Sequence, residues 1–212
     1  MLRKARLLLL AATSTVAAGL IALGAAAVAP HAAHASTAIA LSVEDLVDRS
    51  ETVVVGIPKS KTSRWEGGRI ITYTTVAIDT AVAGAGGKKA GESIVVRTLG
   101  GTVDGIGQIT HGEAVLPVDK PMVLFLRAMP PGGKALAGAL TVTGMAQGAL
   151  AVEVGPDKVA RVIARPVDLV LVPNAKVDPK TAPKPAAETL AGKALPTVVT
   201  ELRALWAARG KK

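Results

Sequence analysis

The side chains that most often catalyse reactions or bind metals are scarce in this sequence. It contains no cysteine and three histidines, and two of these, His31 and His34, lie in the N-terminal segment. The third, His111, stands among glycines, where we expect an exposed loop residue. One histidine without cysteine cannot form a usual zinc site. The run from His111 to Glu113 matches the first half of a zinc-deaminase motif, but the cysteine half is missing. We therefore expect no metal and no cofactor.

Other catalytic patterns are absent or incomplete. The sequence Gly-x-Ser-x-Gly, which presents an activated serine, does not occur. Residues 84–89 are rich in glycine and end in two lysines, but they lack the spacing of a phosphate-binding loop. Glu66, Asp104 and Glu113 lie in expected loops, and a hydrolase acting on sugars would need two such carboxylates in one cleft. An extracytoplasmic hydrolase using these loop carboxylates is the enzyme alternative.

Two glycine-containing segments are the candidate binding sites. In the first, Trp65 precedes Glu66 and two glycines, which is typical of an aromatic anchor for a partner. The alternative is that Trp65 folds over the end of the β domain. The second, residues 100–112, contains five glycines and is either a binding loop or an irregular closure of the sheet. Besides Trp65, the side chains that could bind a partner are Arg64, Asp104, Gln108 and His111.

The N-terminus has the pattern of a secretory signal peptide. Three cations precede an apolar run from Leu7 to Ala29, and no acidic residue appears before Glu44. Ala33 and Ala35 place small side chains at the −3 and −1 positions of a cleavage site after Ala35. The apolar run is also long enough to span a bilayer, so an uncleaved membrane anchor stays open. Residues 1–35 are thus expected to be a signal peptide, and the rest to act as a secreted or periplasmic domain.

Composition narrows the class of partner. The formal net charge is +9, and three of the 25 cations but no acid lie in residues 1–35, which leaves +6 after cleavage. The lysines and arginines are scattered, and only two tryptophans, one tyrosine and one phenylalanine supply aromatic rings. This is no nucleic-acid signature. A protein or an anionic envelope component is the expected partner, and a membrane only if the N-terminal segment stays uncleaved.

The pattern of apolar residues predicts an all-β fold, either an OB-like barrel or a β-sandwich. A short helix is expected over residues 42–48, with Ser42 capping it and Asp45 completing a capping box. Residues 36–172 form the β-rich domain. Its expected strands are 52–57, 70–82, 93–99, 122–127, 139–145, 149–154, 158–164 and 168–172.

The C-terminal region reads as a linker followed by an amphipathic helix. Residues 173–194 contain four prolines among lysines and alanines, which indicates a linker that is extended or disordered. Residues 195–209 carry a one-sided apolar stripe of helical period. The stripe consists of Leu195, Val198, Val199, Leu202, Leu205 and Trp206. We expect it to pack back on the β domain, and the alternative is a helix that docks on a partner or a membrane surface.

The order of strands and glycines over residues 42–127 resembles exported bacterial proteins of unknown function. The resemblance rests on Ser50-Glu51-Thr52-Val53-Val54-Val55-Gly56, on a Trp-Glu-Gly-Gly turn, and on runs starting at Tyr73, Gly91 and Val123. This strand pattern in turn is similar to the OB-type barrel of netrin and metalloproteinase-inhibitor modules. Those inhibitors place an N-terminal cysteine on the target's zinc. Since this chain has no cysteine, the resemblance implies a fold and no site residue.

Together these patterns favour a secreted or periplasmic binding module without enzymatic activity. The hydrolase described above is one alternative, and a structural protein associated with the cell envelope is the other. Fold resemblance alone does not decide among them, because one fold supports many functions.

The expected processing is directly testable. The exported protein should begin at Ser36, because signal peptidase needs the small side chains of Ala33 and Ala35 beside the cut. Intact-mass spectrometry of the exported protein measures this. A mass corresponding to a chain that begins at Met1 would contradict cleavage and support the anchor.

Overall fold

A computed structural model describes residues 36–84, 86–129, 136–178 and 180–209. The predicted signal peptide, residues 1–35, lies outside these residues. In chain order the described elements are β1 (Thr37–Ile39), α2 (Val43–Arg49), β2 (Thr52–Glu66), β3 (Arg69–Ala83), β4 (Ser93–Leu99), β5 (Gly101–Val103), β6 (Ile106–Gln108), β7 (Met122–Ala128), β8 (Leu140–Val142), η1 (Met145–Gly148), β9 (Ala149–Val154), β10 (Ala160–Ile163), β11 (Val170–Val172), α3 (Ala186–Leu190) and α4 (Leu195–Ala208).

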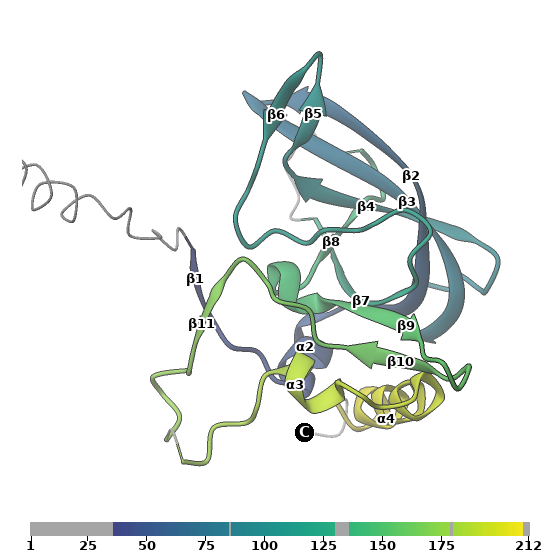
Figure 1. Cartoon of the computed structure of the whole chain (residues 1–212), viewed down its shortest axis with the longest axis vertical. Helices are drawn as coiled ribbons and strands as arrows, with labels where there is room; N and C mark the ends of the chain where they lie inside the picture. The colour runs from purple at the N-terminus through teal and green to yellow at the C-terminus, as the bar shows by residue number, and fades with distance from the viewer. Residues whose placement is uncertain (1–35, 85, 130–135, 179, 210–212) are drawn as a thin grey trace, which may run out of the picture. The chain divides into compact units, whose positions relative to one another are not determined.

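The described chain is mostly β, which confirms the prediction of a β-rich fold. The main sheet has seven strands in the order β10-β9-β7-β2-β3-β4-β8 (Figure 1). The last strand, β8, pairs in parallel with β4 and also antiparallel with β7. Two small sheets, β1-β11 and β5-β6, complete the strand pairing. The pairing of β1 with β11 ties the first described residues to a segment more than a hundred positions later.

Helix α2 forms where the sequence predicts it, and for the predicted reason. The Ser42 hydroxyl accepts a hydrogen bond from the Asp45 N–H at 3.1 Å, and the Asp45 carboxylate accepts one from the Ser42 N–H at 3.1 Å. This capping box satisfies N–H groups that have no partner within the helix. Leu46 and Val47 then lie on the buried face.

The hairpin of β2 and β3 is longer than predicted. Both strands have 15 residues, and β2 continues well beyond the predicted end at Ile57. The outer half of β2 is largely exposed and polar, so it lacks the apolar alternation that predicts a strand. The outer half of β2 is a strand because it pairs with β3, and this pairing continues as far as Glu66 and Arg69. Gly67 and Gly68, at φ +56° and +78°, make the tight turn that suits the twist of a hairpin.

Buried side chains lie on both faces of the main sheet. On one face, Val53, Val55 and Phe125 pack against the helices. On the other, Val54 and Leu124 pack within a second cluster formed by β2, β3, β4, β7, β8 and residues 114–116. The consecutive residues Val53, Val54 and Val55 are all buried, so both faces of β2 are covered at this point.

The stripe of helix α4 packs against the β domain, as expected. Val198 and Leu202 are buried in the same cluster as Val53 and Phe125. Trp206 lies so close to Gly84 that a Cβ there would overlap the indole ring and the Glu51 carbonyl. In Figure 1 α4 lies beside β10 and α2.

Further contacts join the C-terminal region to the rest of the domain. Arg209 donates hydrogen bonds to the carbonyls of Val47 at 2.8 Å and Ser50 at 2.6 Å, at the C-terminal end of α2. Within the expected linker 173–194, residues 186–190 form α3, whose Leu190 is buried. A helix of five residues is too short for its periodicity to be recognised in the sequence. Among the described residues, none of the helices is long and apolar enough to cross a bilayer.

Replacing Leu202 with alanine should lower the free energy of unfolding by about 2–5 kcal/mol, because the change leaves a cavity beneath α4. Chemical denaturation measures it. Thr197→Ala, at an exposed position of the same helix, is the matched control and should change stability by less than about 0.5 kcal/mol. Equal effects of the two substitutions would contradict the docking of α4.

Candidate functional site

Trp65 and Arg64 lie at the far end of the β2–β3 hairpin. The Trp65 side chain is 48% exposed, so it does not fold into the core. Arg64 is held in place, because its guanidinium lies 4.6 Å from the centre of the Tyr73 ring and donates to the Glu66 carboxylate at 2.7–2.8 Å. Both predicted binding residues are about half exposed, at 48% for Trp65 and 47% for the Arg64 side chain, but the guanidinium of Arg64 is already engaged by Glu66 and Tyr73.

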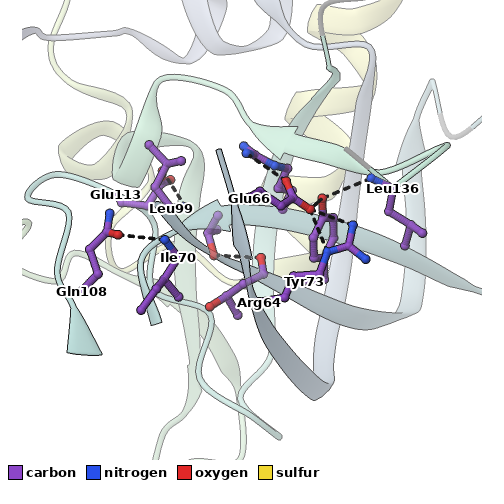
Figure 2. A network of polar contacts seen from close by, with 11 residues as sticks. Arg64, Glu66, Ile70, Tyr73, Leu99, Gln108, Glu113 and Leu136 are labelled. Atoms are coloured by element: carbon purple, nitrogen blue, oxygen red, sulfur yellow. Dashed lines mark hydrogen bonds and ion pairs between the residues drawn. The ribbon is translucent and has the colours of Figure 1, made fainter. Parts of the chain in front are cut away.

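Glu66 is the centre of a polar network that joins three strands (Figure 2). Its Oε1 accepts hydrogen bonds from Arg64 and, at 2.7 Å, from the Tyr73 hydroxyl. Its Oε2 lies 3.5 Å from a guanidinium nitrogen of Arg97 on β4. The Tyr73 hydroxyl in turn accepts from the Leu136 N–H at 3.1 Å. The network therefore fixes the hairpin end against β4 and the segment before β8.

The network keeps Glu66 ionised. Burial alone would raise the pKa of Glu66, whose side chain is only 11% exposed. Hydrogen bonds from Tyr73 and Arg64, with the positive charges of Arg64 and Arg97, outweigh burial and hold the pKa below its ordinary value of 4.5. A general acid at neutral pH needs a raised pKa instead. Glu66 is thus arranged as a structural anion.

The glycine-rich segment 100–112 forms the small hairpin β5–β6. Asp104 and Gly105, at φ +50° and +78°, make its turn. A Cβ on Gly101 would overlap the hydroxyls of Ser63 and Thr72, so glycine allows β5 to approach the long hairpin closely. The Gln108 side-chain oxygen accepts a hydrogen bond from the Ile70 N–H at 2.8 Å (Figure 2). Gln108 therefore attaches β6 to β3, while Asp104 remains exposed.

Glu113 also serves the fold. Its Oε2 accepts from the Leu99 N–H at 3.1 Å, and its Oε1 from the Ala114 N–H at 3.0 Å. Glu113 therefore satisfies main-chain groups at the end of β4, as Figure 2 shows for Leu99. In the described part of the chain, no group of three histidine, cysteine or acidic side chains could hold a metal ion.

His111 is brought to Asp168, a partner that is 57 positions away and was not predicted. The Nδ1 atom of His111 is hydrogen-bonded to the Asp168 carboxylate, and both side chains are substantially exposed. The Ser36 hydroxyl lies near, but it donates to the main-chain carbonyl of His111 at 3.4 Å. Since the hydroxyl does not contact the imidazole, the three side chains are not arranged as a nucleophile with its base.

A cavity of about 690 Å³ opens beside this pair. Five parts of the chain surround it: residues 109–117, Met122 at the start of β7, the stretch from η1 into β9, residues 163–171 and the start of α3. The walls are formed mainly by aliphatic side chains. They are Ile109, Val115, Pro117, Met122, Ala146, Ala149, Leu150, Ala151, Ile163, Ala164, Pro166, Val167, Leu171, Pro185, Ala186 and Ala187. The polar side chains around it are Thr110, Glu113, Gln147, Arg165, Asp168 and Glu188.

The polar groups of the cavity are largely paired with other parts of the fold. Gln147 accepts from the Leu41 N–H at 2.8 Å and donates to the Ile39 carbonyl at 3.1 Å, which anchors the chain after β1. Arg165 forms an ion pair with Glu153 at 2.7 Å. A ligand would therefore interact mainly with the apolar walls, because most polar groups already have partners within the fold.

Glu66→Gln should lower the free energy of unfolding at neutral pH by about 1–3 kcal/mol, since the amide cannot accept as strongly from three donors. The folded-state pKa of Glu66 lies below the ordinary 4.5, so the carboxylate stabilises the fold above pH 4.5. That contribution is lost as the pH falls through the lowered pKa. Denaturation over a pH series should therefore show a flatter profile below pH 4.5 for the variant.

Tyr73→Phe is the matched variant. It removes one donor to Glu66 and keeps the ring that Arg64 packs on, so its pH profile should lie between those of the wild type and Glu66→Gln. A Glu66→Gln protein with the wild-type pH profile would show that the network does not hold the carboxylate ionised.

A comparison of the chain with protein-family models, with curated proteins and with solved structures finds no match in any of the three. The chemistry of the cavity and of the side chains around it is therefore the basis for inferring function.

Proposed function

We propose that this protein is a non-enzymatic binding module and that its ligand occupies the cavity beside His111 and Asp168. The observation that carries the proposal is a cavity of about 690 Å³ with aliphatic walls and a few polar side chains. Pockets that bind small molecules enclose about 300–1,000 Å³, and their walls are mainly apolar with a few polar groups.

Exposed apolar side chains at the cavity support the proposal. Ile109 is 83% exposed and Val115 is 73% exposed, and both line the cavity. Ile106 and Val118, in the same stretch of chain, are also more than 40% exposed. Because apolar surface in water is unfavourable, a group of such residues at a hollow indicates a surface that a ligand covers.

The three loop carboxylates of the hydrolase alternative do not converge on one cleft, because Glu113 lines the cavity and Glu66 and Asp104 do not. A hydrolase would use two acids that face a shared cleft. Glu66 is engaged by Arg64 and Tyr73, and Glu113 by two main-chain N–H groups. Asp104 stands at the turn between β5 and β6. These contacts leave the three carboxylates with structural or solvent-facing positions.

We propose an extracytoplasmic location, after removal of residues 1–35, and an OB-like barrel for the central strands. The barrel is supported by β8, which pairs with β4 on one side and β7 on the other. The signal pattern of the N-terminus supports the location. Association with the envelope through net charge remains the structural alternative.

A protein partner is the second candidate ligand, and Trp65 supports it. Its side chain is half exposed at the end of a hairpin whose outer half is mainly polar. Tryptophan is enriched among residues that contribute most to protein interfaces. This surface is separate from the cavity lining, which does not include Trp65.

Incubating the purified protein with fractionated small molecules from envelope and culture medium tests the proposed function. At least one fraction should raise the thermal unfolding midpoint, because a ligand that binds only the folded state stabilises it. Ala164→Phe, which places a ring at an exposed wall position, should abolish the shift. Ala90→Phe, at an exposed position outside the cavity, is the control and should retain it. The proposal fails if no fraction stabilises the wild type or if Ala164→Phe responds normally.

A further inference from the structure

We infer that the cavity binds a single aliphatic chain whose head group carries no net negative charge. The inference rests on the proposed function and specifies its ligand. Three observations carry it: the chemical nature of the walls, the path from a buried floor to an exposed mouth, and the charges around that mouth.

The walls of the cavity contain no aromatic ring. The chain has four aromatic residues, Trp65, Tyr73, Phe125 and Trp206, and none of them lines the cavity. Planar ligands gain affinity from stacking on aromatic side chains, and aromatic rings have geometric preferences that aliphatic walls do not satisfy. An alkyl chain has no such orientation preference, so it packs well against aliphatic walls on every side. The lining therefore favours an aliphatic chain over an aromatic ligand.

The cavity runs from the core to the solvent. Met122, Leu150 and Ala186 are buried and form part of the floor, whereas Ile109 and Val115 are exposed at the mouth. A ligand suited to both the buried floor and the exposed mouth is apolar along its length and has a head group that stays in water. A volume of about 690 Å³ corresponds to one ligand of ordinary size, so a single chain fits this description.

Acidic side chains outnumber cations around the cavity. Glu113, Asp168 and Glu188 line it with one cation, Arg165. Arg165 is already paired with Glu153 at 2.7 Å. Glu188 is exposed and makes no ion pair within the described residues. An anionic head group would meet net repulsion here, whereas a neutral or cationic head would not.

Three probes with one alkyl chain test the ligand class: dodecylamine, monolaurin and laurate, each measured calorimetrically below its micelle concentration. The amine and the neutral ester should bind, and laurate should bind at least about tenfold more weakly, because of repulsion from the acidic mouth. In a series of shorter alkylamines the affinity should rise by about fourfold for each added methylene until the cavity is filled.

Two pairs of variants locate the binding and its charge preference. Ala164→Phe should abolish binding of all probes, and Ala90→Phe should leave it unchanged. Glu188→Lys should reduce or reverse the difference in affinity by which the wild type binds laurate more weakly than the other two probes. Asp48→Lys makes the same charge change at an exposed position of α2, away from the cavity, and should keep the wild-type preference.

The outcomes separate this inference from the proposed function. If the alkyl probes do not bind, but a fraction of native small molecules stabilises the wild type and not Ala164→Phe, the binding function stands and the aliphatic ligand is refuted. If neither binds, both fail. Binding that ignores chain length, or that survives Ala164→Phe, overturns the inference, and equal affinities for laurate and dodecylamine overturn its head-group part.

Discussion

The fold depends on burying both faces of the adjacent strands β2 and β7. Val53, Val55 and Phe125 point to one side, and Val54 and Leu124 to the other. One side is covered by the remaining strands and the loop before β7. The other would be in water without α2, α3 and α4, whose Leu46, Leu190 and Leu202 are fully or almost fully buried on it. Burial of this apolar area is the main stabilising term, so the helices are integral to the domain.

The polar residues whose types suggest catalysis or binding instead stabilise this fold. Glu66 holds the end of the long hairpin through Arg64, Tyr73 and Arg97. Gln108 and Glu113 accept hydrogen bonds from main-chain groups of Ile70 and Leu99. A buried or half-buried polar group is stabilising only when it is paired, and these side chains are. Around the cavity the fold leaves aliphatic side chains such as Ile109 and Val115 exposed to water, and this favours a binding function.

The sequence allowed much of the fold to be predicted, because its signals are local. Apolar alternation located most strands, and the capping box of Ser42 and Asp45 located α2. The outer half of β2 was missed, since a strand held only by its hairpin partner shows no apolar face. Helix α3 was missed because it is too short for a period to be visible. Among the candidate binding residues, the structure presents Trp65 to solvent and uses Gln108 within the fold.

By itself the sequence determined most of the elements, the scarcity of catalytic groups and the expectation of export, because residue type and spacing along the chain suffice for these. Tertiary structure alone decided that His111 meets Asp168 and that a cavity opens beside them. The cavity walls come from five separate parts of the chain, and none of these by itself contains a pattern that implies a hollow. A cavity is a property of the space between elements, so it exists only once packing has placed Ile109, Leu150 and Ala186 around the same volume.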